Sequence, residues 1–326
     1  MTNLETSYLG LKLKNPIIVG SCGLTGNLES IKRIVVHEPG AIVLKSLFEE
    51  QINADINKNI LQNTELSAEA ETYISSHIAH KNISDYLTLI KECKKITDIP
   101  IIASIHCTDV DEWISYAKKI ESAGADALEV NASILPFDEK LQSTEIEEQY
   151  FHLLEQLREH VSLPIALKMS YYSSSLTHFL QKLSWTGHVQ GFVLFNRFYN
   201  PDINIQTQEI GVSNIFSSAQ EYTLPLRWVA ICSAKIETDV CASTGIHNAD
   251  TIIKMILAGA NATQIVSCVY QQGPEIISNI KKSMIAWMKT HQYKSINDFY
   301  GKLSASKETH ILFERNQFMK YYGSVE

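Results

Sequence analysis

Short apolar runs alternate with longer amphipathic segments along most of the chain. The apolar runs are continuous, which is typical of strands in a parallel sheet buried on both faces. Eight such runs are predicted as strands, at residues 15–21, 41–44, 101–105, 127–131, 164–168, 191–196, 240–242 and 262–266. Helical spacing of apolar residues predicts helices at 28–36, 83–97, 110–123, 143–160, 174–183, 225–231, 249–257 and 274–290. Strands that are each followed by a helix favour an α/β fold of the (β/α)8 TIM-barrel type over an open doubly wound sheet.

Three polar stretches are too long to be simple connections between a strand and its helix. They are residues 46–82, 133–142 and 197–218, after predicted strands two, four and six. Long insertions of this kind usually form lids or covers of a site. No shift in composition marks a linker. We therefore expect one domain over 1–326, with the barrel at about 9–290 and a polar C-terminal tail at 291–326.

Composition and charge narrow the class of partner. The chain has 326 residues, 45% of them hydrophobic, which is enough for one large core. A net charge of −8 without a block of Lys or Arg argues against nucleic acid as a partner. The N-terminus is polar and acidic rather than signal-like, and no apolar run reaches the roughly 18 residues that span a bilayer. We expect a soluble, cytoplasmic protein without a membrane partner.

The cysteines are scattered, at positions 22, 93, 107, 232, 241 and 268, and no CxxC pair occurs. Several of them lie in apolar, strand-like runs. This pattern favours buried, reduced thiols over disulfides or a metal site.

Polar residues close several of the apolar strands. In a (β/α)8 barrel these carboxyl ends meet at the face where the chemistry takes place. The residues concerned are Gly20, Ser21, Lys45, Ser46, Asn131, Lys168, Asn196 and Arg197. Unpaired amines are disfavoured in a barrel interior, so we expect a bound planar, polar ligand. Asparagine amides can bond the edges of such a ring and a lysine can stabilise negative charge on it, although either lysine alone could simply be snorkelling or salt-bridged.

Residues 242–270 resemble the phosphate clamp of a parallel barrel. A strand, a small-residue turn at Thr244–Gly245 and a helix are followed by a second strand that runs into Val266–Ser267. Backbone N–H groups at such strand ends and helix starts can bind an anion. An ordinary βαβ crossover with a helix capped by Gly259 is the alternative.

The chain resembles the dihydroorotate dehydrogenase family of FMN-dependent (β/α)8 barrels. The resemblance runs from about residue 9 to 275 and is carried by GLKLKNPIIVGS, IVLKS, LEVNAS, ALKMS, LFN and TGIHNADTIIKMILAGANATQIVS. The chain enters the barrel almost at once, as the soluble branch of that family does. The resemblance implies FMN as the cofactor and hydride transfer between flavin N5 and a small substrate.

The resemblance also implies roles for individual residues at the first, second and fifth strand ends. Gly20 and Ser21 match residues that contact the flavin. Lys45 matches a lysine near both flavin and substrate and is a predicted catalytic residue, with Ser46 beside it in the cofactor site. Lys168 matches the lysine at the pyrimidine edge of the ring, where it would stabilise the anionic reduced form.

Asn131 and Asn196 match residues shared between flavin and substrate pocket, and we predict both as catalytic residues. Thr244–Gly245 and Val266–Ser267 match the phosphate loops, where the family has Gly-Gly and another Gly. The Thr244 hydroxyl could add a donor there. Arg197 is predicted to bind a carboxylate substrate or a carboxylate partner residue.

One segment departs from the family. The soluble branch reads Asn-Leu-Ser-Cys-Pro-Asn after strand four, and its cysteine is the base that takes the substrate proton. This chain has Ile134 at the base position and Pro136 at that of a substrate-binding asparagine. Isoleucine cannot accept a proton, so the dihydroorotate site is predicted to be altered. Candidate replacements for the base are His106, Cys107 and Ser133.

Three hypotheses follow. The first is an FMN-dependent oxidoreductase acting on a small substrate that carries a carboxylate. The second is a flavin-binding subunit or regulator without independent catalysis, which works with a redox partner protein. The third is an aldolase-type barrel with Lys45 or Lys168 as the Schiff-base nucleophile. Aromatic residues in the loops could support a homodimer.

Overall fold

Eight parallel strands close into a barrel in the computed structural model, which describes residues 2–48, 68–106, 110–132, 134, 138–198, 201–305 and 313. The barrel strands are β3 (Ile17–Val19), β4 (Ala41–Val43), β6 (Ile101–His106), β7 (Ala127–Val130), β8 (Ile165–Met169), β9 (Gly191–Leu194), β12 (Asp239–Ser243) and β13 (Ala262–Ile265). Their order is β4-β3-β13-β12-β9-β8-β7-β6, and a β4–β6 pairing closes the ring. A short strand, β5 (Leu47–Phe48), pairs with the end of β6. The predicted (β/α)8 fold is confirmed.

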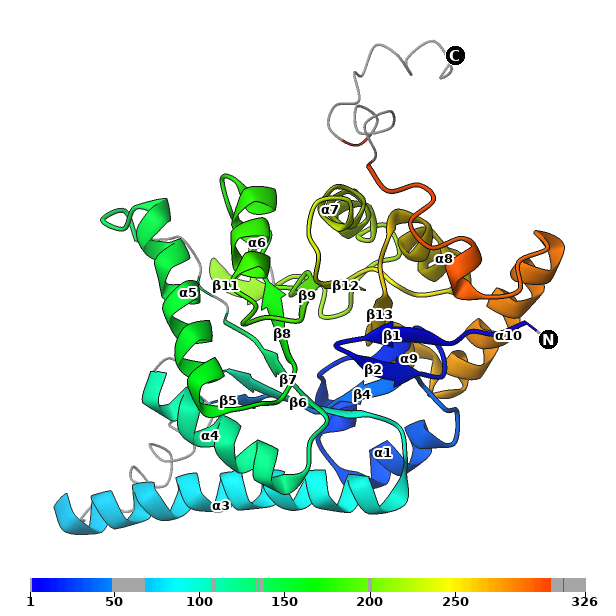
Figure 1. Ribbon diagram of the computed structural model, residues 1–326. Helices are drawn as coiled ribbons and strands as arrows, with labels where there is room; N and C mark the ends of the chain where they lie inside the picture. The colour runs from blue at the N-terminus through cyan, green and yellow to red at the C-terminus, as the bar shows by residue number, and fades with distance from the viewer. Residues whose placement is uncertain are drawn as a thin grey trace.

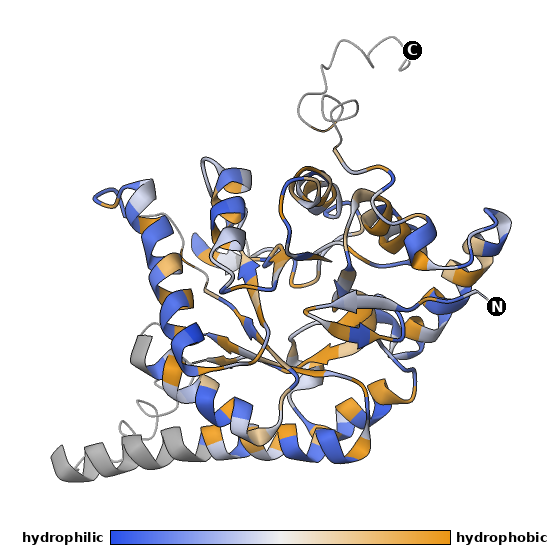
Figure 2. Ribbon diagram, viewed as in Figure 1, coloured by the Kyte–Doolittle hydropathy of each residue, from blue (hydrophilic) through white to orange (hydrophobic). Residues whose placement is uncertain are grey.

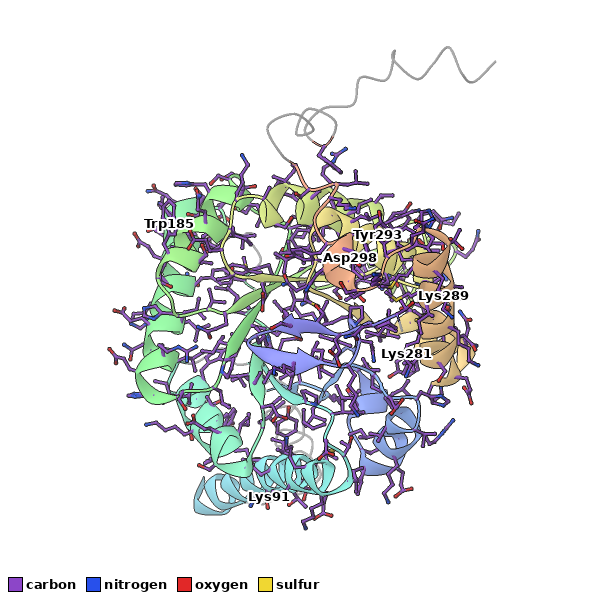
Figure 3. All side chains as sticks on the ribbon, turned by 45° about the vertical axis from the view of Figure 1, so that its right-hand side comes forward. Lys91, Trp185, Lys281, Lys289, Tyr293 and Asp298 are labelled. Atoms are coloured by element: carbon purple, nitrogen blue, oxygen red, sulfur yellow. The ribbon has the colours of Figure 1, made fainter. Side chains whose placement is uncertain are left out.

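The helices surround the strands (Figure 1). They are α1 (Leu28–Val35), α3 (Ala68–Ile96), α4 (Val110–Ala123), α5 (Ser143–His160), α6 (Leu176–Trp185), α7 (Thr223–Ser233), α8 (Ala249–Ala258), α9 (Ser267–Gln272) and α10 (Glu275–Thr290). Two 3-10 turns lie at η1 (Gly23–Thr25) and η2 (Ile296–Asp298). Apolar and polar stripes alternate around the helices (Figure 2), and Lys91 on α3 and Lys289 on α10 lie on the outer surface (Figure 3).

The structure corrects two boundaries. Helix α3 begins at Ala68 rather than at the predicted residue 83, so part of the insertion 46–82 is helical. The additional short helix α9 lies directly after β13, where the sequence predicted only a strand end.

An N-terminal hairpin closes the end of the barrel opposite the carboxyl ends of the strands. It consists of β1 (Thr6–Tyr8) and β2 (Leu11–Leu13), and it crosses the middle of the ring in Figure 3. Tyr8, Leu9 and Leu13 are buried against residues at the starts of the barrel strands. The Leu9 N–H donates to the carboxylate of Asp239 on β12, at 2.7 Å. The sequence did not predict this hairpin.

A second unpredicted hairpin lies in the third insertion. Strands β10 (Pro201–Asn204) and β11 (Glu209–Val212) pair antiparallel, and Ile203 faces Ile210 across them. Both isoleucines are exposed.

The described cysteines agree with the expected thiols. Cys93, Cys232, Cys241 and Cys268 are buried, Cys22 is half-buried, and all five are free. Cys107 lies outside the described residues. Among described residues, no group of His, Cys, Asp and Glu is arranged to hold a metal ion. No helix within the described ranges is long and apolar enough to cross a membrane.

Candidate active site at the mouth of the barrel

A cavity of about 420 Å³ opens at the carboxyl ends of the strands. Eight residues that the sequence predicted for the site line it: Ser21, Lys168, Asn196, Arg197, Thr244, Gly245, Val266 and Ser267. The other described lining residues are Cys22, Gly23, Ile215, Phe216, Ser217, Ser243, Ile246, Gln264 and Tyr270. Small-molecule sites have volumes of about 300–1,000 Å³, so the cavity can hold a cofactor-sized ligand.

Lys168 lies in this lining with its ammonium group held from within the barrel. Its Nζ atom donates to Glu129 Oε1 and to Gln264 Oε1, at 3.2 Å each. Glu129 and Gln264 are almost fully buried, and Lys168 is 9% exposed. An ammonium group has three N–H donors. The third has no acceptor among the described residues, so it is available to a ligand in the cavity.

The two predicted asparagines bond to each other across the barrel mouth. Asn196 Nδ2 donates to Asn131 Oδ1 at 3.0 Å, and the Asn196 N–H donates to the Met169 carbonyl at 2.8 Å. His106 Nδ1 lies at hydrogen-bond distance from the Asn131 carbonyl, and its ring meets Trp113 edge-on at 6.5 Å. These contacts fix the asparagines, while His106 remains a candidate base held by the backbone.

The turn at Thr244–Gly245 lines the cavity and carries two backbone donors. Both residues have positive φ, 81° and 74°. Neither N–H group donates to an acceptor among the described residues, whereas the Thr244 hydroxyl donates to the Phe195 carbonyl at 3.2 Å. The Thr244 hydroxyl is engaged with this carbonyl here, so its expected role as an extra donor stays a prediction. The backbone groups remain able to bind an anion.

Three polar side chains gather next to this turn. Ser217, which is 7% exposed, donates from its hydroxyl to Ser267 Oγ at 3.1 Å and from its N–H to the same atom at 3.0 Å. Its Oγ also lies 3.0 Å from His247 Nε2. Burial lowers the pKa of His247, which favours the neutral imidazole. Ser217 and His247 were not predicted site residues. His247 does follow a strand end, whereas Ser217 lies in the third insertion, where no strand-end pattern marks it.

Arg197 is bonded within the chain. Its Nε donates to Glu221 Oε2 at 2.9 Å, and its terminal nitrogens donate to the carbonyls of Asn214, Ile215 and Phe216. Burial would raise the pKa of Glu221, but hydrogen bonds from Arg197 and Ser218 lower it overall. The carboxylate partner is thus a residue of the chain, and Arg197 anchors the segment that carries Ser217.

Four predicted site residues do not line this cavity: Gly20, Lys45, Ser46 and Asn131. A side chain at Gly20 would approach Val266 Cγ2 to 2.9 Å, so glycine allows β3 to lie close to β13. The Ser46 hydroxyl lies 3.1 Å from that of Ser21. Lys45 is exposed, with Cδ 3.1 Å from where a Gly26 Cβ would stand. Its catalytic role stays a prediction.

Ile134, at the expected base position, lines a separate cavity of about 440 Å³ beside α5 and α6. Tyr150, Met169 and Phe179 also line that cavity. The Ile134 N–H donates to the Ala132 carbonyl at 2.9 Å. The other two candidate bases, Cys107 and Ser133, lie outside the described residues, as does Pro136.

Glu129 and Gln264 were not predicted as site residues, although the sequence carries a signal for both. Each interrupts a continuous apolar strand, in the segments ALEV and ATQIV. A polar residue in the middle of such a strand needs a buried partner. The sequence could not show that both partners converge on Lys168 from different strands.

The arrangement combines an ammonium donor and amide groups with unpaired backbone donors in one cavity. It can bind a ligand that has an electron-accepting polar ring and an anionic end. Lys168 is ion-paired with Glu129, and an ammonium is a poor nucleophile. This geometry disfavours the Schiff-base hypothesis for Lys168.

Comparison with known proteins agrees with the geometry. A family model described as dihydroorotate dehydrogenase matches residues 3–288. A "Dihydroorotate dehydrogenase B (NAD(+)), catalytic subunit" of Thermoplasma acidophilum is 23% identical over 92% of this chain and 99% of its own length. The protein of the same description from Caldicellulosiruptor bescii is 25% identical over 93% and 99%. A "Dihydroorotate dehydrogenase A (fumarate)" of Lactobacillus helveticus is 24% identical over the same shares. The chain belongs to the dihydroorotate dehydrogenase family.

Proposed function

We propose that the chain is an FMN-dependent oxidoreductase that moves a hydride between a small substrate and the flavin. The observation that carries this proposal is the placement of Lys168. Lys168 lines the same cavity as Thr244 and Gly245, whose N–H groups have no acceptor among the described residues. One cavity thus offers a charged donor for a ring and a separate set of donors for a phosphate.

The residues present fit the cofactor of this family. Thr244 and Gly245 would hold the phosphate through their N–H groups, and Ser267 would do so through its hydroxyl. Lys168 would lie against the ring and offset negative charge on it. Bound FMN would supply the acceptor for the hydride.

The substrate end of the site is proposed to differ from that of a dihydroorotate dehydrogenase. Removal of a proton from dihydroorotate needs a base beside the hydride donor carbon. Ile134 has no group that accepts a proton, and its side chain lines the second cavity. We therefore propose that the substrate is a small molecule that carries a carboxylate. Turnover of dihydroorotate should be slow or absent.

Equilibrium binding of FMN and riboflavin to flavin-free protein tests the proposal. The two ligands differ only by the phosphate, so FMN should bind at least about tenfold more tightly than riboflavin. Lys168→Met should weaken the binding of both, whereas Lys182→Met, at an exposed position of α6, should weaken neither. Failure of FMN to bind, or equal affinity for both flavins, would contradict the proposal.

A second candidate function is that of a flavin-binding subunit that exchanges electrons with a protein partner. Two of the similar proteins are described as catalytic subunits, and the usual base position holds Ile134. For this function we expect a protein that co-purifies stably and a flavin that only this partner reduces. Reduction of the flavin by a small substrate alone would favour the first candidate.

A further inference from the structure

A carboxylate lies directly beneath Lys168, inside the barrel. Glu129 is 1% exposed, and both of its oxygens have a partner. Oε1 accepts from Lys168 Nζ at 3.2 Å, and Oε2 accepts from Gln264 Nε2. Gln264 Oε1 accepts in turn from Lys168 Nζ at 3.2 Å. Three side chains therefore form a closed ring of three hydrogen bonds.

This ring of hydrogen bonds joins strands on two sides of the barrel. Glu129 on β7 pairs in register with Ala166 on the neighbouring β8, which carries Lys168 two residues later. Gln264 is on β13, separated from β8 by β9 and β12. The amide thus reaches across the interior to a carboxylate that the strand pairing alone would not bring to it.

Beneath this ring of hydrogen bonds lie two buried groups that can titrate. Tyr8 and Cys241 belong to the buried cluster at the closed end of the barrel. Burial raises the pKa of each, and the negative charge of Glu129 raises both further. The carboxyl of Asp239 also acts on them from the start of β12. Both Tyr8 and Cys241 stay neutral near pH 7, so among the described residues Glu129 is the carboxylate that pairs with Lys168.

Stability does not explain this ion pair, because a buried pair gains little over apolar side chains of the same volume. The orientation of Lys168 offers a better reason. Two of its three N–H donors are fixed from below and from the side, which leaves the third for the cavity. An ammonium held in this way needs no reorganisation when charge develops above it.

We propose that Glu129 is a positioning residue. Together with Gln264, it fixes the Lys168 side chain and keeps that side chain protonated beneath the cofactor ring. The proposal rests on the FMN site proposed above. It deepens that site by assigning its electrostatics to a residue that the cofactor does not touch. Glu129 acts only through Lys168.

The two charges have opposite effects on a reduced, anionic ring. The Lys168 ammonium stabilises the flavin ring, and the Glu129 carboxylate beneath Lys168 partly cancels that effect. In Glu129→Gln this cancellation is lost, so the ring is easier to reduce while Lys168 remains charged. A buried amine without an anion gives up its proton as the pH rises. The same variant should then be harder to reduce than the wild type.

Reduction potentials of the flavin-loaded protein at about pH 6 and about pH 9 test this idea. At a fixed potential, Glu129→Gln should raise the reduced-to-oxidised ratio roughly tenfold at the lower pH and lower it roughly tenfold at the higher pH. In the Lys168→Met background the same substitution should change the reduced-to-oxidised ratio in the same direction at both pH values. The lysine that titrates is then absent, and Asp239 and every other group are unchanged. An offset that does not depend on pH in the chain with Lys168 would overturn the proposal.

A double-mutant cycle in the flavin-free chain separates this proposal from the proposed function. Glu129→Gln and Lys168→Met should each lower the midpoint of denaturant unfolding. The loss in the double variant should be smaller than the sum of the two single losses. Additive losses would overturn the hold of Glu129 on Lys168, whatever the chain binds. Coupled losses in a chain that takes up no FMN would instead refute the proposed function and with it the role beneath a flavin.

Discussion

At Gly245 the chain has no room for a side chain. A Cβ there would lie 2.2 Å from the Tyr222 nitrogen and 2.7 Å from the Glu221 carbonyl carbon, and both are backbone atoms that cannot rotate away. Positive φ adds to the requirement for glycine. The turn that presents the two unpaired N–H groups therefore depends on this residue.

Gly245→Ala and Gly124→Ala form a matched pair that tests the turn. Gly124 also has positive φ, 93°, but a Cβ there would meet nothing within 4 Å. Gly124→Ala should lower the free energy of unfolding by about 1 kcal/mol, the cost of a left-handed alanine. Gly245→Ala should lower it further and weaken FMN uptake. Equal losses in urea unfolding, with FMN uptake retained, would show that the turn tolerates a side chain.

Residues of the candidate site were predictable from the sequence where they close a strand. Lys168, Asn196 and Ser267 do so, and they line one cavity. Ser217 and Glu221 were not predictable, because one lies in the third insertion and the other just after it. Ser217 reaches the site by bonding to Ser267, and Glu221 does so by pairing with Arg197. Nothing in the local spacing of these two residues encodes that fold.

At the scale of elements, the barrel strands and main helices were predictable because each carries its own hydrophobic period. The N-terminal hairpin was not, because its turn lacks the usual signal. Leu9 and Gly10 have φ of 55° and 74°, a conformation that favours Asn-Gly. Burial of Leu9 and its bond to Asp239 offset the cost, and both depend on the completed barrel.

Two buried tyrosines give opposite predictions for removal of a hydroxyl. The Tyr8 hydroxyl of the hairpin has no nitrogen or oxygen partner among the described residues, and the weakly polar Cys241 thiol lies beside it. The Tyr86 hydroxyl of α3 accepts from the Ser104 N–H at 2.9 Å and donates to its carbonyl at 3.1 Å. Tyr8→Phe should raise the free energy of unfolding by about 1 kcal/mol, and Tyr86→Phe should lower it by about 1–3 kcal/mol. Denaturant unfolding of both variants checks this, and a loss in Tyr8→Phe would point to a missed partner.

The segment before α7 should respond to acid through Glu221. Its pKa is lowered in the folded chain, so its contribution to stability is present above its unfolded pKa and is lost as the pH falls through the folded pKa. The wild type should therefore lose more stability than Glu221→Gln between about pH 5 and about pH 3. Glu155→Gln, at an exposed position of α5, is the control and should follow the wild type. If the free energy of unfolding depends on pH in the same way in the wild type and in Glu221→Gln, the ion pair does not contribute to acid sensitivity.

At the scale of the whole molecule, eight repeats predicted closure of the barrel, and the β4–β6 pairing completes it. Closure brings Glu129, Lys168 and Gln264 together from three strands. It also places the Thr244–Gly245 turn at the same cavity as Lys168 and Gln264. The family match over residues 3–288 agrees with this architecture. The altered base position distinguishes this chain from the family pattern implied by the resemblance.

The flavin absorbance of the purified protein, recorded before and after dihydroorotate is added without oxygen, tests the central claim most directly. We predict flavin bands, present as purified or after FMN is added, that persist when dihydroorotate is supplied. Absence of flavin bands even with added FMN would contradict the cofactor site built around Lys168 and Thr244–Gly245. Rapid bleaching by dihydroorotate would contradict the altered substrate site and would place the base at a residue other than Ile134.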